Sequence, residues 1–117
     1  MSETAQLLRV CEAADVPTDG ALKVETGDLV LAVFNLGGTF FVTDDQCTHG
    51  PGSLSEGDIY NGVVECNFHG GAFNIKTGEV FSPPCMIPVK IYAVSVSNRA
   101  VYISAPTRDQ DSQTTQP

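Results

Sequence analysis

Two short boxes constrain what this chain can fold into more than any other feature, because each pairs one cysteine with one histidine. The first box is Cys47-Thr48-His49-Gly50, and the second is Cys66-Asn67-Phe68-His69-Gly70-Gly71. The chain has only 2 histidines, and both fall in these boxes. Thiolates and imidazoles are ligands for zinc and for iron. A bound metal would also stabilise a segment that has little hydrophobic core of its own.

Three kinds of site could use these cysteines and histidines. Four nitrogen and sulfur ligands can hold structural zinc, although zinc knuckles usually place two cysteines together and each box here is mixed. A catalytic Cys/His pair is a second alternative, but it leaves the other matching pair unexplained. An iron–sulfur cluster with two cysteine and two histidine ligands uses all four residues.

The sequence around the boxes predicts an all-β domain. Short apolar alternations and frequent turn signals run through a chain with 11 glycines and 7 prolines. We expect a helical turn over 12–15, a hairpin turn at Gly37-Gly38, and a regular alternation from Pro88 to Val94 that places Tyr92 and Ile91 on opposite faces. The expected strands are 6–10, 21–25, 29–35, 39–43, 63–65, 73–75 and 100–104.

The chain divides into a β framework and a loop-rich insert. Residues 44–86 are rich in Gly, Pro, Asp, Asn and Ser and contain both boxes. We therefore expect a single domain over 1–106, with a subdomain of about 44–86 inserted into a β base. The polar tail 107–117 is expected to be disordered.

The Cys-x-His box followed by the Cys-x-x-His box resembles the Rieske motif. The resemblance implies a Rieske [2Fe–2S] fold, in which an antiparallel β-sandwich base carries a loop-rich cluster-binding subdomain. It also implies one [2Fe–2S] cluster, with Cys47 and Cys66 on one iron and His49 and His69 on the other. The loops around the cluster would be shaped by Gly50, Gly70, Gly71, Pro83 and Pro84. Cys11 and Cys85 are expected to pack as small apolar residues.

Departures from the respiratory and photosynthetic Rieske proteins point to a low reduction potential. Those proteins carry an extra cysteine in each box and a serine after the second box, where this chain has Gly52, Phe68 and Gly71. Fewer hydrogen bonds to sulfur leave the reduced cluster less stabilised. We therefore expect a potential near the low end of the Rieske range, about −150 mV.

Three segments look like those of the ferredoxin component of bacterial aromatic-ring-hydroxylating dioxygenase systems. They are the first box, residues 66–73 and residues 84–90. The resemblance implies a soluble electron carrier rather than an enzyme. It would take single electrons from a flavin-containing NAD(P)H-dependent ferredoxin reductase and pass them to a terminal Rieske oxygenase. A small Rieske subunit of a nitrite-reductase-like complex and a zinc-stabilised interaction module are the alternatives.

Charge narrows the range of partners. The net charge is −8, and no Lys or Arg lies between Lys23 and Lys76. Nucleic acid and anionic membranes would repel such a chain. With no long apolar run and no signal-peptide pattern, we expect a cytoplasmic protein, and a monomer suits a carrier. A docking patch is expected to consist of an apolar rim ringed by acids, namely Pro51, Phe68 and Pro84 with Asp44, Asp45 and Glu56.

Overall fold

Antiparallel strands make up most of the computed structural model, which describes residues 7–48, 52–67, 71–82 and 87–104. The first sheet has the strand order β1-β11-β10, the second β2-β3-β4-β9 and the third β5-β6-β7-β8. The all-β prediction is therefore confirmed. The strands of the first two sheets are β1 (Leu7–Glu12), β2 (Gly20–Thr26), β3 (Leu29–Leu36), β4 (Thr39–Asp44), β9 (Ile91–Tyr92), β10 (Val94–Ser97) and β11 (Ala100–Ser104). Those of the third sheet are β5 (Asp58–Tyr60), β6 (Val63–Glu65), β7 (Ala72–Asn74) and β8 (Val80–Ser82).

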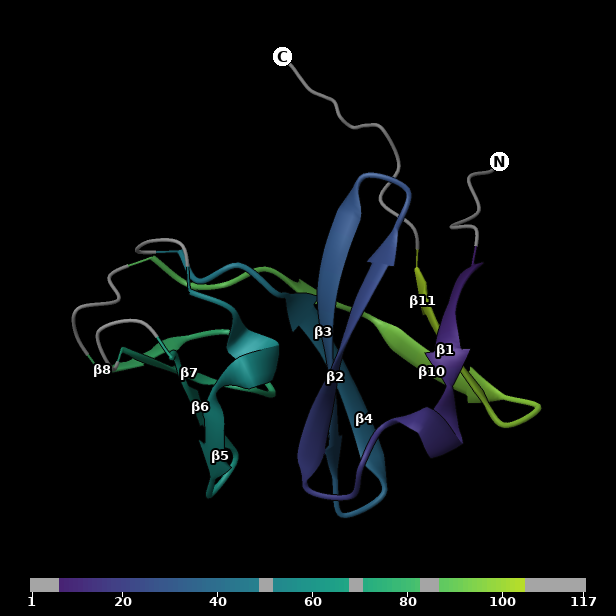
Figure 1. The fold of residues 1–117 in the computed structure, drawn as a ribbon, viewed down its shortest axis with the longest axis horizontal. Coiled ribbons are helices and arrows are strands. Elements are labelled where there is room, and N and C mark those ends of the chain that lie inside the picture. The colour runs from purple at the N-terminus through teal and green to yellow at the C-terminus, as the bar shows by residue number, and fades with distance from the viewer. Residues whose placement is uncertain (1–6, 49–51, 68–70, 83–86, 105–117) are drawn as a thin grey trace.

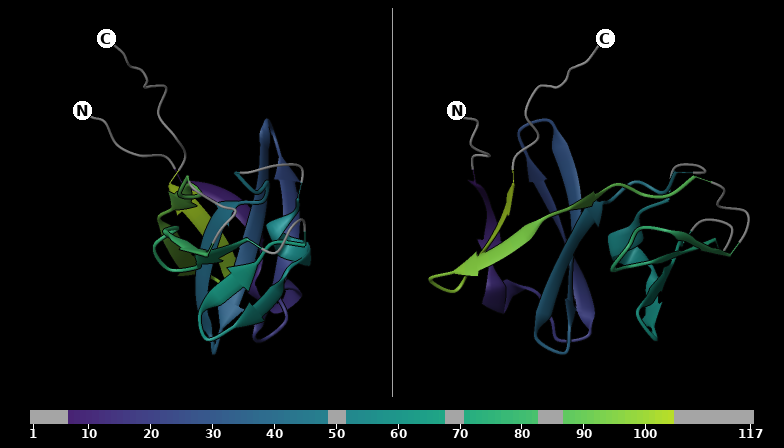
Figure 2. Two further views of the ribbon diagram at one scale, coloured as in Figure 1. Left: turned by 90° about the vertical axis from the view of Figure 1, so that its left-hand side faces the viewer. Right: turned by 180° about the vertical axis from the view of Figure 1, so that it is seen from behind.

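Strand β3 is the centre of the molecule, because both of its faces are covered. Leu31 and Val33 pack in a core shared with the first sheet, whereas Ala32 and Phe34 pack in a core shared with the third sheet. All four side chains are fully buried. This accounts for the nearly continuous apolar sequence of β3, since a strand covered on both faces does not alternate with polar residues. Figures 1 and 2 show the second sheet between the other two.

A β-bulge explains why two consecutive residues of β1 are both buried. The pairing of β1 with β11 shifts register between Arg9 and Cys11. The extra residue, Val10, turns inward together with Cys11, whereas an unbroken strand would point them to opposite faces. Cys11 therefore packs in the core as expected, and burial raises the pKa of its thiol.

Two short 3-10 helices interrupt the strands. Ala13–Asp15 follows β1, close to the helical turn predicted over 12–15. Leu54–Glu56, η2, lies between β4 and β5 and buries Leu54 under the third sheet and β3. No helix in the part of the chain that the structure describes has the length and apolar character needed to cross a bilayer.

The alternation predicted from Pro88 to Val94 agrees with the packing of this segment, although the segment passes from one sheet to another. Tyr92 ends β9 in the second sheet, and β10 begins at Val94 in the first sheet. Val89 and Tyr92 are buried, whereas Ile91 is 43% exposed. The two buried residues lie on opposite sides, as the alternation requires, because Val89 packs in the core shared with the third sheet and Tyr92 in the core shared with the first sheet.

The β10–β11 turn is strained and offers a test of the fold. Asn98 and Arg99 connect the two strands with φ angles of 52° and 65°, the left-handed region that suits asparagine and glycine but not arginine. We expect Arg99→Gly to stabilise the protein by about 1 kcal/mol, raising its thermal midpoint by roughly 4–8 °C.

The matched control for this prediction is Asn98→Gly, which should give a smaller gain because asparagine already tolerates this conformation. The Arg99 side chain is exposed, and its carbonyl, which accepts a hydrogen bond from the Ala13 N–H at 2.8 Å, is kept by glycine. An unchanged or lower midpoint for Arg99→Gly, measured by far-UV circular dichroism, would contradict the strain argument.

Candidate metal centre

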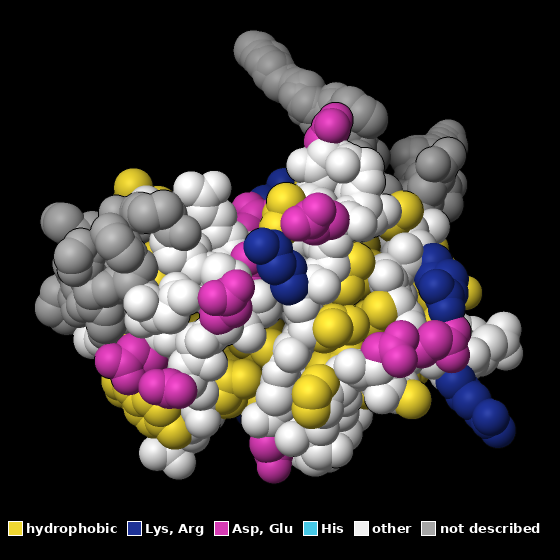
Figure 3. Space-filling model, viewed as in Figure 1, with side chains coloured by type: hydrophobic (Ala, Val, Ile, Leu, Met, Phe, Trp, Pro, Cys, Tyr) yellow, Lys and Arg dark blue, Asp and Glu magenta, His cyan; other side chains and the backbone are white. Residues whose placement is uncertain are grey.

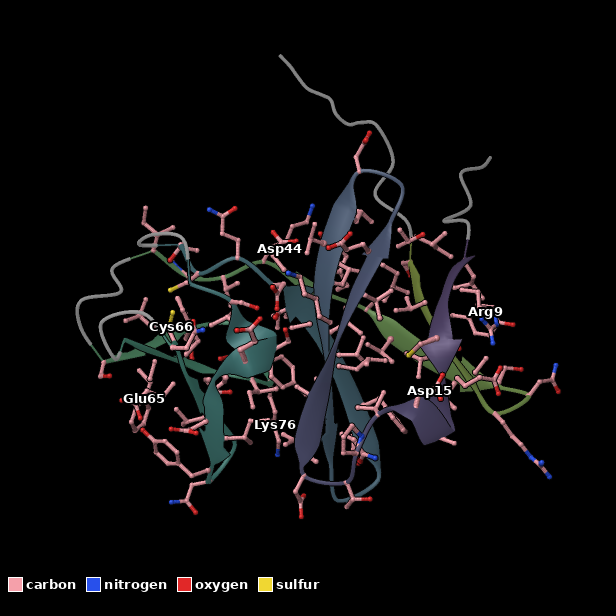
Figure 4. All side chains as sticks on the ribbon, in the orientation of Figure 1. Arg9, Asp15, Asp44, Glu65, Cys66 and Lys76 are labelled. Carbon is pink, nitrogen blue, oxygen red and sulfur yellow. The ribbon has the colours of Figure 1, made fainter. Side chains whose placement is uncertain are left out.

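The two cysteines of the boxes lie where the chain leaves two different strands. Cys47 follows the end of β4 at Asp44, and Cys66 follows β6 directly. Their exposed fractions are 2% and 3%, and both belong to one buried core with Leu54 and Phe73. Figure 4 shows Cys66 in the part of the molecule that lies farthest from the first sheet.

The same backbone hydrogen bond closes both boxes. The Cys47 N–H donates to the Gly52 carbonyl at 2.9 Å, and the Cys66 N–H donates to the Gly71 carbonyl at 2.6 Å. In each case the acceptor lies five residues after the cysteine, so the bond spans 48–51 in one box and 67–70 in the other. The two boxes are thus structurally equivalent at the cysteine, although their histidine spacings differ in sequence.

Several of the residues predicted for the site lie outside the described part of the chain. They are His49, His69, Gly50, Gly70, Pro83, Pro84 and Cys85, together with Pro51 and Phe68 of the predicted apolar rim. Gly71, at the end of the second box, is described and buried.

Side chains connect the two boxes to each other and to the chain that returns toward β9. Asn67 Oδ1 accepts the N–H of Ser53 at 2.9 Å, and Asn67 Nδ2 donates to Glu56 Oε1 at 3.3 Å. Thr48 Oγ1 donates to the Ile87 carbonyl at 2.7 Å. These contacts were not predicted from the sequence, although Asn67 and Thr48 stand directly after the two cysteines.

Gly78 lets the β7–β8 hairpin pack closely against the segment that leads into β9. Its φ is +77°, and its N–H and carbonyl are bonded to Asn74 and Val89. A Cβ at this position would lie 2.3 Å from the Val89 carbonyl oxygen, so only glycine allows the approach.

The predicted acidic ring is only partly on the surface. Glu56 is exposed and Asp44 is half-buried, but only 3% of Asp45 is exposed. The prediction that Asp45 contributes to a docking surface is therefore wrong. Asp44 accepts a hydrogen bond from the Tyr92 hydroxyl at 2.6 Å. Burial and this bond raise the pKa of Tyr92, which therefore stays protonated as the donor. On the face drawn in Figure 3, acidic side chains outnumber basic ones.

The described residues fit a metal centre with soft ligands. A thiolate is costly to bury unless a cation or a metal compensates its charge, and here two thiol side chains are buried at the entrances of two linked loops. Sulfur ligands favour zinc or an iron–sulfur cluster over the hard cations. The described geometry alone suits either of these.

Comparisons with known proteins distinguish an iron–sulfur cluster from zinc. The profile of the Rieske [2Fe–2S] domain matches residues 6–93. Ferredoxin CarAc of Metapseudomonas resinovorans is 44% identical over 98 residues, which cover 83% of this chain and 92% of the relative. The biphenyl dioxygenase ferredoxin subunit of Pseudomonas sp. (strain KKS102) is 45% identical over 96 residues, covering 81% of this chain and 88% of the relative.

Solved structures show the same likeness. The ferredoxin of Sphingomonas yanoikuyae B1 superposes with a TM-score of 0.82 at 40% identity, covering 86% of this chain and 100% of that one. A chain in the complex of reduced oxygenase and oxidized ferredoxin of carbazole 1,9a-dioxygenase gives a TM-score of 0.79 at 42% identity. That match covers 86% of this chain and 94% of the other.

Proposed function

The chain belongs to the Rieske [2Fe–2S] domain family and binds a cluster of that type, and we propose that it carries single electrons to an oxygenase. The observation that carries this proposal is its similarity to ferredoxin subunits of dioxygenase systems over nearly their whole length. Its role in such a system is that of an electron-transfer component and not of the enzyme that reacts with the substrate.

We assign the ligands as the sequence predicts. Cys47 and Cys66 would bind one iron as thiolates, and His49 and His69 would bind the other iron as imidazoles. The burial of both cysteines, the equivalent closing bonds of the two boxes and the contact between Ser53 and Asn67 support this assignment. The cluster supplies a site that accepts and releases one electron at a potential raised by the two imidazoles.

The partners follow from the relatives. One solved relative is a complex of an oxygenase with a ferredoxin, and another relative is a subunit of biphenyl dioxygenase. We propose a terminal oxygenase of an aromatic-ring-hydroxylating dioxygenase as the electron acceptor and a flavin-containing NAD(P)H reductase as the donor. A monomer in the cytoplasm, where NAD(P)H is available, suits such a carrier.

We also propose the domain boundaries expected from the sequence, namely one domain over 1–106 with an inserted cluster-binding unit of about 44–86. The third sheet lies within this unit, and the first two sheets are built from the residues on either side of it.

Electron delivery tests the function directly. Anaerobic titration with dithionite should place one electron on each cluster, and the reduced protein should then reduce an excess of the oxygenase of carbazole 1,9a-dioxygenase in a stopped-flow experiment. Protein prepared without iron should deliver nothing. Purification of the chain only as a tight complex with a large catalytic subunit would favour the nitrite-reductase-like alternative and contradict a diffusible carrier.

A further inference from the structure

Asp45 is the one charged side chain that is buried among the residues that the structure describes. Its Oδ2 accepts the Ser53 hydroxyl at 2.6 Å, and its Oδ1 accepts the Ser55 N–H at 2.8 Å. Lys23 Nζ lies 4.0 Å from Oδ2. All three neighbours are donors. An ionised carboxylate offers only acceptors, so this environment matches the charged form of Asp45.

The backbone of Asp45 holds the entrance and the exit of the first box together. Its N–H donates to the Val30 carbonyl on β3 at 2.9 Å, and its carbonyl accepts the Leu54 N–H at 2.7 Å. Beside it, Gln46 and Ser53 form an isolated antiparallel bridge. The next pair along the loop is Cys47 and Gly52, which are joined by the backbone hydrogen bond described above. Asp45 therefore fixes the base of the loop that presents the Cys47 thiolate.

Lys23 compensates the carboxylate only in part. It comes from β2 in the second sheet, and its side chain is 42% exposed, whereas that of Asp45 is 4% exposed. Water screens the ammonium more strongly than the buried carboxylate, because an exposed charge lies in a medium of high dielectric constant. The incompletely compensated Asp45 carboxylate therefore leaves a net negative potential two residues from Cys47, a proposed cluster ligand.

We propose that Asp45 is a positioning residue for the first box whose fixed charge lowers the reduction potential of the cluster, and that Lys23 limits this effect. The inference rests on the proposed function, since it assumes that Cys47 binds the cluster. An electron added near a fixed negative charge is less stable, and the interaction is stronger in a buried site than in water.

Two substitutions with opposite expected signs test the proposal. Asp45→Asn keeps the shape and an oxygen acceptor for the Ser55 N–H but removes the charge, so the potential should rise. Lys23→Met keeps the length of the side chain but removes the ammonium, so the potential should fall. We expect the reduction equilibrium to shift at least about threefold in each case, roughly 28 mV at 59 mV per tenfold change.

The measurement is a redox titration of the cluster-loaded protein followed by visible circular dichroism, with the electron paramagnetic resonance spectrum checking that the cluster is intact. Asp15→Asn is the matched control, because it also removes one carboxylate but lies at the opposite end of the molecule from Cys66 (Figure 4). Its potential should stay at the wild-type value. Shifts of the same sign in Asp45→Asn and Lys23→Met, or no shift in either, would overturn the proposal.

The exposed Lys23 keeps the proposal testable if Asp45→Asn does not retain a cluster. In that case an unchanged potential in Lys23→Met would overturn the electrostatic role, and a lowered potential would support it. The potential is measured without any partner protein. Failure of this inference would therefore leave electron delivery to the oxygenase intact, whereas failure of the proposed function would appear as absent delivery at any potential.

Discussion

Cys66→Ala is expected to yield a protein that contains little or no iron or acid-labile sulfide. The substitution removes one of the four proposed ligands, and alanine offers no donor in its place. A cluster held by three ligands has an open coordination position, and its binding free energy also contributes to the folding of the loops. Iron and sulfide analysis after anaerobic preparation, together with the visible absorption spectrum, measures the loss.

Cys11→Ala is the matched control for this experiment. It removes another buried thiol, but this one packs in the core between the first and second sheets. The variant should retain two irons per chain even if its stability falls somewhat. A full complement of iron and sulfide in Cys66→Ala would contradict the ligand assignment, and far-UV circular dichroism would show whether the sheets are still formed.

The strands of the base could be predicted because their signals are local. β11 has the predicted bounds, and β3 and β4 differ from the predicted ranges by one residue at their ends. Each is an apolar run bounded by a turn that its own residues specify. At Gly37 and Gly38, for example, φ angles of 63° and 98° match a turn that glycine favours.

The third sheet was predicted only in part, although one missed strand had a sequence signal. β5 and β6 are joined by Asn61 and Gly62 with φ angles of 51° and 76°, and Asn-Gly is a strong hairpin signal. A hairpin could have been predicted at this point. β8 has weaker evidence in its sequence, because Phe81 is 60% exposed and the strand lies at the edge of its sheet.

The environment of Asp45 could not be predicted from the sequence. An aspartate in an acidic, glycine-rich stretch ordinarily lies on the surface. Its burial depends on Ser53 and Ser55, which return to it only because η2 folds the chain back against β3, and on Lys23 from a different strand. Such long-range donors follow no sequence period, so the sequence predicts candidate cysteine ligands but not the polar residues that lie around them.

Packing between the second and third sheets should determine whether the cluster loops have a stable base, and Phe34 is the residue that tests it. Phe34 is fully buried on the face of β3 that packs in one core with Cys47, Cys66 and Phe73. Truncation of a buried phenylalanine to alanine costs about 3–5 kcal/mol, through lost burial and the cavity left behind. Phe34→Ala should therefore lower the thermal midpoint of the cluster-loaded protein by at least about 10 °C.

Phe81→Ala makes the same chemical change at a side chain that is 60% exposed, and its midpoint should shift little. Circular dichroism in the far-UV region would follow the sheets, and visible absorption would follow the cluster. Because Phe34 and the two cysteines share one core, both signals should be lost over the same lowered temperature range in Phe34→Ala. Loss of the cluster at the wild-type temperature, with only the sheets melting earlier, would show that the loops hold the cluster independently of the β3 face.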